Sequence, residues 1–293
     1  MTSIPPSMIT LPDRPVGVAE YGSITGEPVM FCHGLPGSHV EAAAFDEAAA
    51  AADMRIIAID RPGIGASPLA RRERVADWSG TVAAVADQLG LDRFAVLGVS
   101  GGGPYALACA HGLPARVTAT VLVSAPAPFD HEAAASGESA RQRGIGLRLM
   151  HRFPFLARPV AARMSTLVRK PSGLAALIAQ MAPVDRTRLE DPALAAELEA
   201  NLTQAFASGS RGVAVDTLLL FARPWGFDLA DITVPVHIWH GDADNNVPVA
   251  DGRQLAAALP NHTLNIVAGA GHLMFVDHAA AILNSIRAGE TRG

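Results

Sequence analysis

Charged residues, aromatic residues and cysteines are all scarce in this sequence. Of its 293 residues only 17% are charged and 5% are aromatic, whereas 49% are hydrophobic. Disordered chains combine low hydrophobicity with high net charge, so a net charge of -5 at this hydrophobic content excludes that class. The weakly acidic balance also argues against a nucleic-acid-binding surface, and we expect no nucleic-acid partner.

The two cysteines, Cys32 and Cys109, lie in apolar stretches and show no metal-binding or redox spacing. We therefore expect two reduced, buried thiols. Residues 1–13 lack the basic and apolar regions of a signal peptide. No run of about 18 apolar residues occurs, which is the length that a membrane-spanning helix needs. Together these absences predict a cytoplasmic protein with no membrane span.

The chain instead contains short β-branched runs that alternate with alanine-rich stretches. The alternation predicts βαβ units and an α/β fold, with a mostly parallel sheet covered by helices on both faces. The expected strands are Val29–Cys32, Arg55–Ile59, Phe94–Val99, Val117–Val123, Val234–Trp239 and Thr263–Val267. The expected helices are Glu41–Ala52, Val75–Leu89, Pro104–His111, Val249–Leu259 and Phe275–Ile286.

Residues 126–225 interrupt this alternation. They show helical periodicity, several prolines and no convincing strand, so we interpret them as a mainly helical insertion over one end of the sheet. The core would then comprise residues 1–125 and 226–293. The first part of the insertion is rich in arginine, which we attribute to solvated helix faces rather than to an anion-binding surface.

The strongest local motif is Gly98-Val-Ser100-Gly-Gly102, placed directly after a predicted strand and before a predicted helix. In this setting G-x-S-x-G predicts a sharp turn that presents the Ser100 hydroxyl at the end of the sheet. Small neighbours are required because the turn brings strand and helix backbones close together. A glycine-rich turn without chemical function is the alternative. A phosphate loop is disfavoured because neither of its sequence patterns is present.

A serine needs a base, and the base needs an orienting carboxylate. Gly241-Asp-Ala-Asp244 follows one predicted strand, and Gly271-His272 follows the next. Because the carboxyl ends of parallel strands meet at one edge, three loops that follow such strands can converge there. The chain order Ser100, Asp244, His272 is the order of one particular hydrolase fold.

At this point the sequence resembles the α/β-hydrolase family. His33-Gly-Leu-Pro-Gly37 is similar to the loop that follows the family's third strand. Asp60-Arg-Pro-Gly-Ile-Gly-Ala-Ser67 is similar to its D-R-x-G-x-G-x-S turn. The resemblance covers roughly residues 16–125 and 226–290, and it places residues 126–225 where the family carries a variable helical cap.

The resemblance implies a nucleophile at Ser100, a general base and acid at His272, and an orienting carboxylate at Asp244. It also implies an oxyanion hole made by the backbone N–H groups of Leu35 and Gly101. Asp242 is the alternative acid, but Asp244 fits the family's G-x-x-D-x-x-x-P pattern between Gly241 and Pro248.

Other histidines and acid positions are less suitable. His33 is expected to shape the oxyanion loop rather than to transfer protons. His262 precedes a predicted strand and His278 lies inside a helix, so we expect packing or surface roles. Some relatives place the acid after the strand that precedes the cap, but Ser124-Ala125 stands there.

A serine at the sharp turn after Val99 favours attack on a carbonyl. It argues against dehalogenase or epoxide hydrolase chemistry, which uses an aspartate at that position. We expect hydrolysis of carboxylic esters, or of lactones, thioesters or amides, on a small and mainly apolar substrate. C–C bond hydrolysis, perhydrolysis, cofactor-independent oxygenation and a silent ligand receptor remain alternatives. Leu273, Met274 and Phe275, next to His272, line either an acyl pocket or the core. No cofactor and no metal site is expected, because no ligand cluster stands out. Oligomeric state is not predicted.

Overall fold

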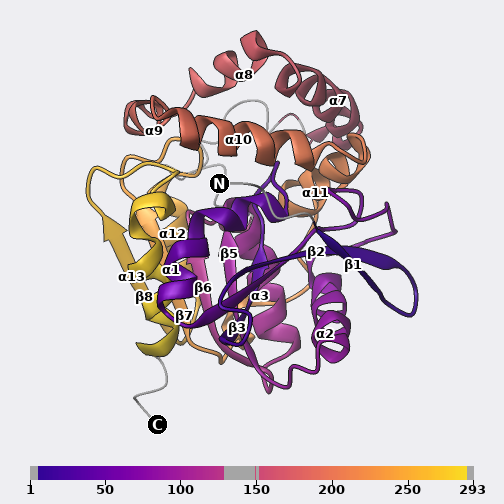
Figure 1. Ribbon diagram of the computed structural model, residues 1–293, viewed down its shortest axis with the longest axis vertical. Helices are drawn as coiled ribbons and strands as arrows, with labels where there is room; N and C mark the ends of the chain where they lie inside the picture. Colours follow the sequence, from indigo (N-terminus) through magenta and orange to yellow (C-terminus); the bar gives the residue numbers. More distant parts are fainter. Residues whose placement is uncertain (1–5, 129–148, 150–151, 289–293) are drawn as a thin grey trace.

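An eight-stranded sheet forms the centre of the computed structural model, which describes residues 6–128, 149 and 152–288 (Figure 1). The strand order is β1-β2-β4-β3-β5-β6-β7-β8. β1 and β2 pair antiparallel, β2 pairs antiparallel with β4, and the pairs from β4 through β8 are parallel. The strands are β1 Ser7–Thr10, β2 Pro15–Gly22, β3 Glu27–Cys32, β4 Met54–Ile59, β5 Phe94–Val99, β6 Val117–Val123, β7 Val236–Gly241 and β8 His262–Val267.

The central strands are mainly apolar because both faces of the sheet are covered. All six residues of β5 are buried. One face carries α2 (Trp78–Gln88), α3 (Gly103–Gly112) and α12 (Val249–Ala258), whose apolar residues form one core. The other face carries α1 (Asp46–Ala51) and α13 (Phe275–Ala288), which form a second core. The prediction of an α/β fold with a mostly parallel sheet is confirmed.

A further group of helices lies along one side of this core and is called the helical layer below (Figure 1). It runs between β6 and β7 in the chain. Its helices are α7 Ala157–Val168, α8 Pro171–Ile178, α9 Pro183–Arg188, α10 Pro192–Ala205 and α11 Arg211–Phe221. Helices α8, α9 and α10 carry proline at their first or second position, and α7 follows a short 3₁₀ turn that also begins with proline. At a helix start the N–H that proline lacks would have no partner in the helix, so proline is tolerated there. The predicted insertion limits, 126 and 225, stay predictions, and residues 129–148 and 150–151 lie outside the described residues.

Two predicted helices begin with a 3₁₀ segment. The single helix expected over Glu41–Ala52 is a 3₁₀ helix, η1 (His39–Phe45), followed by α1, and the Ser38 side chain accepts the Val40 N–H at its start. The helix expected from Val75 likewise opens with a 3₁₀ turn, η2 (Val75–Asp77). The remaining 3₁₀ turns are η3 Ser100–Gly102, η4 Pro154–Leu156 and η5 Leu229–Asp231.

The hairpin β1–β2 at the start of the sheet was not predicted. Ser7–Thr10 is only four residues long and does not alternate polar with apolar residues, so its sequence does not mark an edge strand. Within the described ranges, no helix has both the length and the apolar character needed to cross a bilayer.

Candidate active site

Ser100 lies at the sharp turn between β5 and α3. Its φ is +50°, a left-handed conformation that is uncommon outside glycine and is often found at functional sites. The turn depends on its glycines. A Cβ on Gly98 would lie 2.6 Å from the Gly102 carbonyl oxygen, and a Cβ on Gly102 would clash with the Cys32 carbonyl. The sequence pattern therefore sets how closely strand and helix approach, and that approach holds Ser100 at the end of β5.

Asp244 and His272 come from the loops after β7 and β8 and are joined by a hydrogen bond. His272 Nδ1 lies 2.7 Å from Asp244 Oδ2. The other oxygen, Oδ1, accepts the backbone N–H groups of Asn246 and Val247 at 2.8 and 2.9 Å, which fixes the carboxylate. A carboxylate oxygen can only accept, so Nδ1 carries the proton and Nε2 is the basic nitrogen.

This pairing changes the acidity of both groups. Burial alone would raise the pKa of Asp244, but the charge and hydrogen bond of His272 outweigh it and lower that pKa. Burial alone would lower the pKa of His272, but the Asp244 carboxylate raises it above its ordinary value. The protonated form of His272 is thus stabilised, as is required of a general base that takes up a proton during the reaction.

Ser100 and His272 border the same cavity, which has a volume of about 290 Å³. Within the described residues no hydrogen bond joins them, which is common before substrate binds. Leu273 and Phe275 line this cavity. Met274 does not line the cavity. Its side chain is fully buried in the core around α13, because the backbone just before this helix directs it inward. The helical layer supplies most of the opposite wall, with Met164, Leu174, Leu177, Ile178, Gln180, Met181, Leu198, Asn201 and Leu202.

The two residues predicted to supply oxyanion-hole donors lie next to one another. A Cβ added to Gly101 would sit 3.2 Å from the Leu35 nitrogen. In the part of the chain that the structure describes, the Leu35 N–H has no hydrogen-bond partner. Leu35 also borders the cavity, beside Ser100. The loop therefore leaves a free backbone donor beside the predicted nucleophile.

A buried polar network supports the Leu35 loop. His33 is fully buried, and its Nδ1 donates to the Gly34 carbonyl at 2.9 Å. Burial and the nearby Arg61 lower the pKa of His33 to about 3, so the ring stays neutral. Arg61 donates to the carbonyls of His33 and Gly34 at 2.5 and 2.8 Å. Its guanidinium is held in turn by Asp216 of α11, at 2.6 Å.

Asp216 connects the helical layer to this loop. It is fully buried and also pairs with Arg72 and accepts from the Tyr105 hydroxyl at 3.0 Å. Burial would raise its pKa, but the two arginines lower it to about 2. The carboxylate is thus charged at any physiological pH, and its loss would leave two arginines without their partner.

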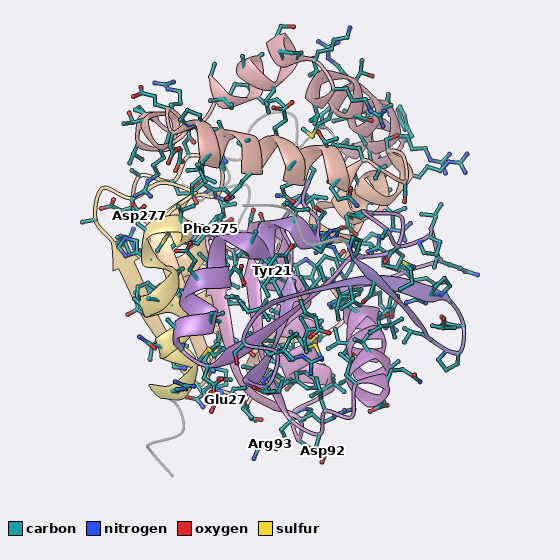
Figure 2. All side chains as sticks on the ribbon, viewed as in Figure 1. Tyr21, Glu27, Asp92, Arg93, Phe275 and Asp277 are labelled. Atoms are coloured by element: carbon teal, nitrogen blue, oxygen red, sulfur yellow. The ribbon has the colours of Figure 1, made fainter. Side chains whose placement is uncertain are left out.

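Asp185 of α9 makes a second connection between the layer and the site. It is fully buried, and its two oxygens accept the backbone N–H groups of His272 and Leu273 at 2.8 and 2.9 Å. Arg188, one turn later, forms an ion pair with Asp277 of α13. Phe275 and Asp277 are labelled in Figure 2 at the end of α13 that faces the helical layer. The loop that carries His272 is therefore held from above by α9.

The alternatives considered for the acid and base lie elsewhere. Asp242 is exposed and accepts the Gly269 N–H at 2.7 Å, so it shapes the loop rather than contacting a histidine. His262 bonds the Leu259 carbonyl at the start of β8, and His278 lies inside α13. Among the described residues, no three His, Cys, Asp or Glu side chains gather as metal ligands would.

Sequence reasoning missed Glu41, Asp185 and Asp216. For Asp216 a signal was present, because a lone carboxylate within the apolar run 213–220 of a helix is rarely buried without a cationic partner. Asp185 and Glu41 carry no comparable local signal. Their positions at the site depend on how the helical layer and η1 pack, and a single sequence does not contain that information.

Fold and site together define a class: a sheet of mostly parallel strands with a serine elbow, and an aspartate–histidine pair at its carboxyl edge. The chain belongs to the α/β-hydrolase fold family, whose pattern matches residues 27–279. It is 28% identical over 238 residues to a 2-hydroxy-6-oxononadienedioate/2-hydroxy-6-oxononatrienedioate hydrolase of Pseudomonas putida, covering 78% of this chain and 74% of that protein.

Solved structures show the same fold. An α/β-hydrolase fold protein from Nakamurella multipartita is 27% identical, with a TM-score of 0.69 over 97% of this chain and 98% of that one. An esterase from Exiguobacterium antarcticum superposes with a TM-score of 0.71 at 20% identity, covering 96% and 99%.

Proposed function

We propose that this protein is a serine hydrolase that cleaves carboxylic esters through an acyl-enzyme intermediate. The observation that carries the proposal is the placement of Ser100 and His272 on one cavity, with His272 Nδ1 bonded to Asp244 at 2.7 Å. Membership of a hydrolase family supports the same class of reaction. Lactones, thioesters and amides would follow the same chemistry.

In this mechanism His272 Nε2 removes the proton from the Ser100 hydroxyl as its oxygen attacks the ester carbonyl. The negative charge that forms on the carbonyl oxygen is stabilised by the N–H groups of Leu35 and Gly101. The tetrahedral intermediate collapses, the ester C–O bond breaks, and the protonated His272 gives its proton to the departing alcohol. Water, activated by the same nitrogen, then releases the acid and restores Ser100.

The cavity favours substrates that are mainly apolar. Most of the residues that surround Ser100 are leucine, isoleucine, methionine or phenylalanine, and they come from both the core and the helical layer. A cavity of about 290 Å³ lies at the lower end of typical small-molecule sites. We therefore propose esters with small or medium apolar acyl groups as substrates.

Hydrolysis of p-nitrophenyl acetate and butyrate tests this proposal. The wild type should release p-nitrophenolate, and Ser100→Ala should lower kcat by at least about 10⁴-fold. Ser79→Ala is a matched control, because the Ser79 hydroxyl, at the start of α2, donates to the Ala76 carbonyl of η2 and lies outside the cavity. A Ser100→Ala protein that keeps wild-type turnover would overturn the proposal, as would a folded wild type without activity on any ester of a varied panel.

Hydrolysis of a C–C bond beside a ketone is a second candidate. The similarity to the hydroxy-oxo-dienedioate hydrolase over 78% of the chain favours it. That relative's name denotes a substrate with two carboxylates. Parallel assays on a hydroxy-oxo-dienoate and on p-nitrophenyl esters distinguish the candidates, because a C–C hydrolase would turn over the dienoate with the higher kcat/KM.

A further inference from the structure

Glu41 of η1 places a carboxyl group on the wall of the catalytic cavity. Its Oε2 accepts the Gly34 N–H at 2.5 Å, and its Oε1 has no hydrogen-bond partner within the described residues. A methyl group added to Gly34 would lie 3.0 Å from Glu41 Oε1 and 3.5 Å from the Ser100 Cβ. Little more than the width of one methyl group therefore separates this carboxyl from the predicted nucleophile.

Glu41 also borders a second, smaller cavity of about 50 Å³ on the other side of Phe275 and Leu198, which line both. Glu197 of α10 lines that side cavity as well. Among the described residues, the ionisable groups that border either cavity are Glu41, Glu197 and His272. The two carboxyl groups on these walls carry negative charge when they are ionised, and Glu41 is the one that also borders the catalytic cavity.

The basic groups near Glu41 are each paired with an aspartate. His272 and Arg61 both act on its carboxylate electrostatically, and Arg61 is already paired with Asp216 at 2.6 Å. His39, on the same 3₁₀ helix, is paired with Asp60 at 2.8 Å. Glu197, from the packed helix α10, adds a charge of the same sign.

We propose that Glu41 is a specificity-determining residue that makes the site accept esters with an uncharged acyl group and reject those whose acyl group carries a carboxylate. The inference rests on the proposed ester hydrolysis and names its substrate class. The physical reason is repulsion: two like charges a few ångströms apart in a largely apolar cavity destabilise the complex, whereas a neutral acyl chain of the same size meets no such cost.

The strength of this selection depends on pH. Burial raises the pKa of Glu41 to about 7, although the Gly34 N–H, His272 and Arg61 oppose the shift. Below that value the carboxyl is neutral and tolerates an anionic substrate. Above it the carboxylate forms and repels one. Discrimination against a carboxylate-bearing ester therefore grows as pH rises through neutrality.

The test compares two p-nitrophenyl esters of adipic acid, one with its second carboxyl free and one with it methylated. Their sizes are matched, and the free acid is ionised throughout the range from about pH 6 to about pH 9. Both reactions need neutral His272, so its titration cancels in the ratio of their kcat/KM values. In the wild type the preference for the methylated ester should rise at least about tenfold across this range.

Glu41→Gln keeps an oxygen for the Gly34 N–H but removes the charge. It should lower the high-pH preference at least about tenfold and remove its pH dependence. Glu197→Gln, the same change on the side cavity alone, should alter the preference by less than about twofold, since that carboxylate lies farther from the reacting ester.

A preference that is unchanged in Glu41→Gln, or an equal change in Glu197→Gln, would overturn the inference while leaving ester hydrolysis intact. If Glu41→Gln does not fold, a wild-type preference that stays flat with pH overturns it instead. Cleavage of neither ester would overturn the proposed function, and this inference with it.

Discussion

Asp185, in helix α9 of the helical layer, accepts the backbone N–H groups of both His272 and Leu273, at 2.8 and 2.9 Å. The carboxylate is fully buried and its negative charge raises the pKa of His272, in addition to the effect of Asp244. Asp185 is thus a positioning residue: it contacts the loop of the predicted base, not the cavity. Docking of the helical layer and the geometry of the site are thereby coupled.

Asp185→Asn should lower kcat on p-nitrophenyl butyrate by about 10- to 100-fold, because one of the two N–H groups loses its acceptor and the loop shifts. The lost charge should also lower the pKa of His272. The raised pKa makes activity fall as pH drops through it, so the acidic limb of kcat/KM should move to lower pH in the variant. A pH–rate profile measures both effects.

Asp191→Asn is the matched control for this prediction. Asp191 is exposed on the same layer and caps α10 by accepting the Ala193 N–H, a role that asparagine fills equally well. Its profile should match that of the wild type. If Asp185→Asn lost activity only in proportion to its unfolded fraction, with the acidic limb unmoved, a positioning role would be refuted.

Asp244→Asn tests the choice between the two aspartates of the loop after β7. Asp244 contacts His272, whereas Asp242 contacts the Gly269 N–H. Asp244→Asn should lower kcat by about 10⁴-fold, because the amide no longer holds the required tautomer or stabilises the imidazolium. Asp242→Asn should cost less than about tenfold in the same assay. The reverse order of losses would transfer the orienting role to Asp242.

Asp216→Asn should destabilise the protein by about 3–5 kcal/mol, because it leaves Arg61 and Arg72 buried beside a neutral side chain. Urea unfolding measures this change. Asp231→Asn, on the exposed turn η5, should change the free energy of unfolding by less than about 0.5 kcal/mol. Equal stabilities of the two variants would contradict the network described here.

The pH dependence of that stability follows from the Asp216 pKa of about 2. The pKa of Asp216 is lower in the folded than in the unfolded protein. Its carboxylate therefore contributes fully to the free energy of unfolding above its unfolded-state pKa of about 3.9. The contribution is lost as pH falls toward about 2. Wild-type stability should therefore decline over this range more steeply than that of Asp216→Asn.

The local sequence pattern was sufficient to predict the central strands and the sharp turn at Ser100. β5 and β6 match their predicted limits because buried parallel strands are mainly apolar, and each of these two strands is followed directly by a serine. The Asp244–His272 contact followed from two loops at one sheet edge. In each case the information lies in residues that are adjacent in the chain or fixed by the order of the strands.

What the sequence did not predict depends on packing between distant segments. Asp185 and His272 are 87 residues apart, and Arg61 and Asp216 are 155 apart. No periodicity links such pairs. Met274 illustrates the same limit, because its neighbours Leu273 and Phe275 face the cavity while its own side chain enters the core. The direction of one side chain at a helix start decides that difference.

Covalent labelling with a fluorophosphonate tests the central claim most directly, because the reagent reacts much faster with a serine activated by a base and an oxyanion hole than with other side chains. We predict one adduct per chain, located on Ser100 by peptide mass spectrometry, with loss of ester hydrolysis in step with labelling. His272→Ala should abolish the adduct. A folded wild-type protein that forms no adduct, or forms it on a different residue, would contradict the account.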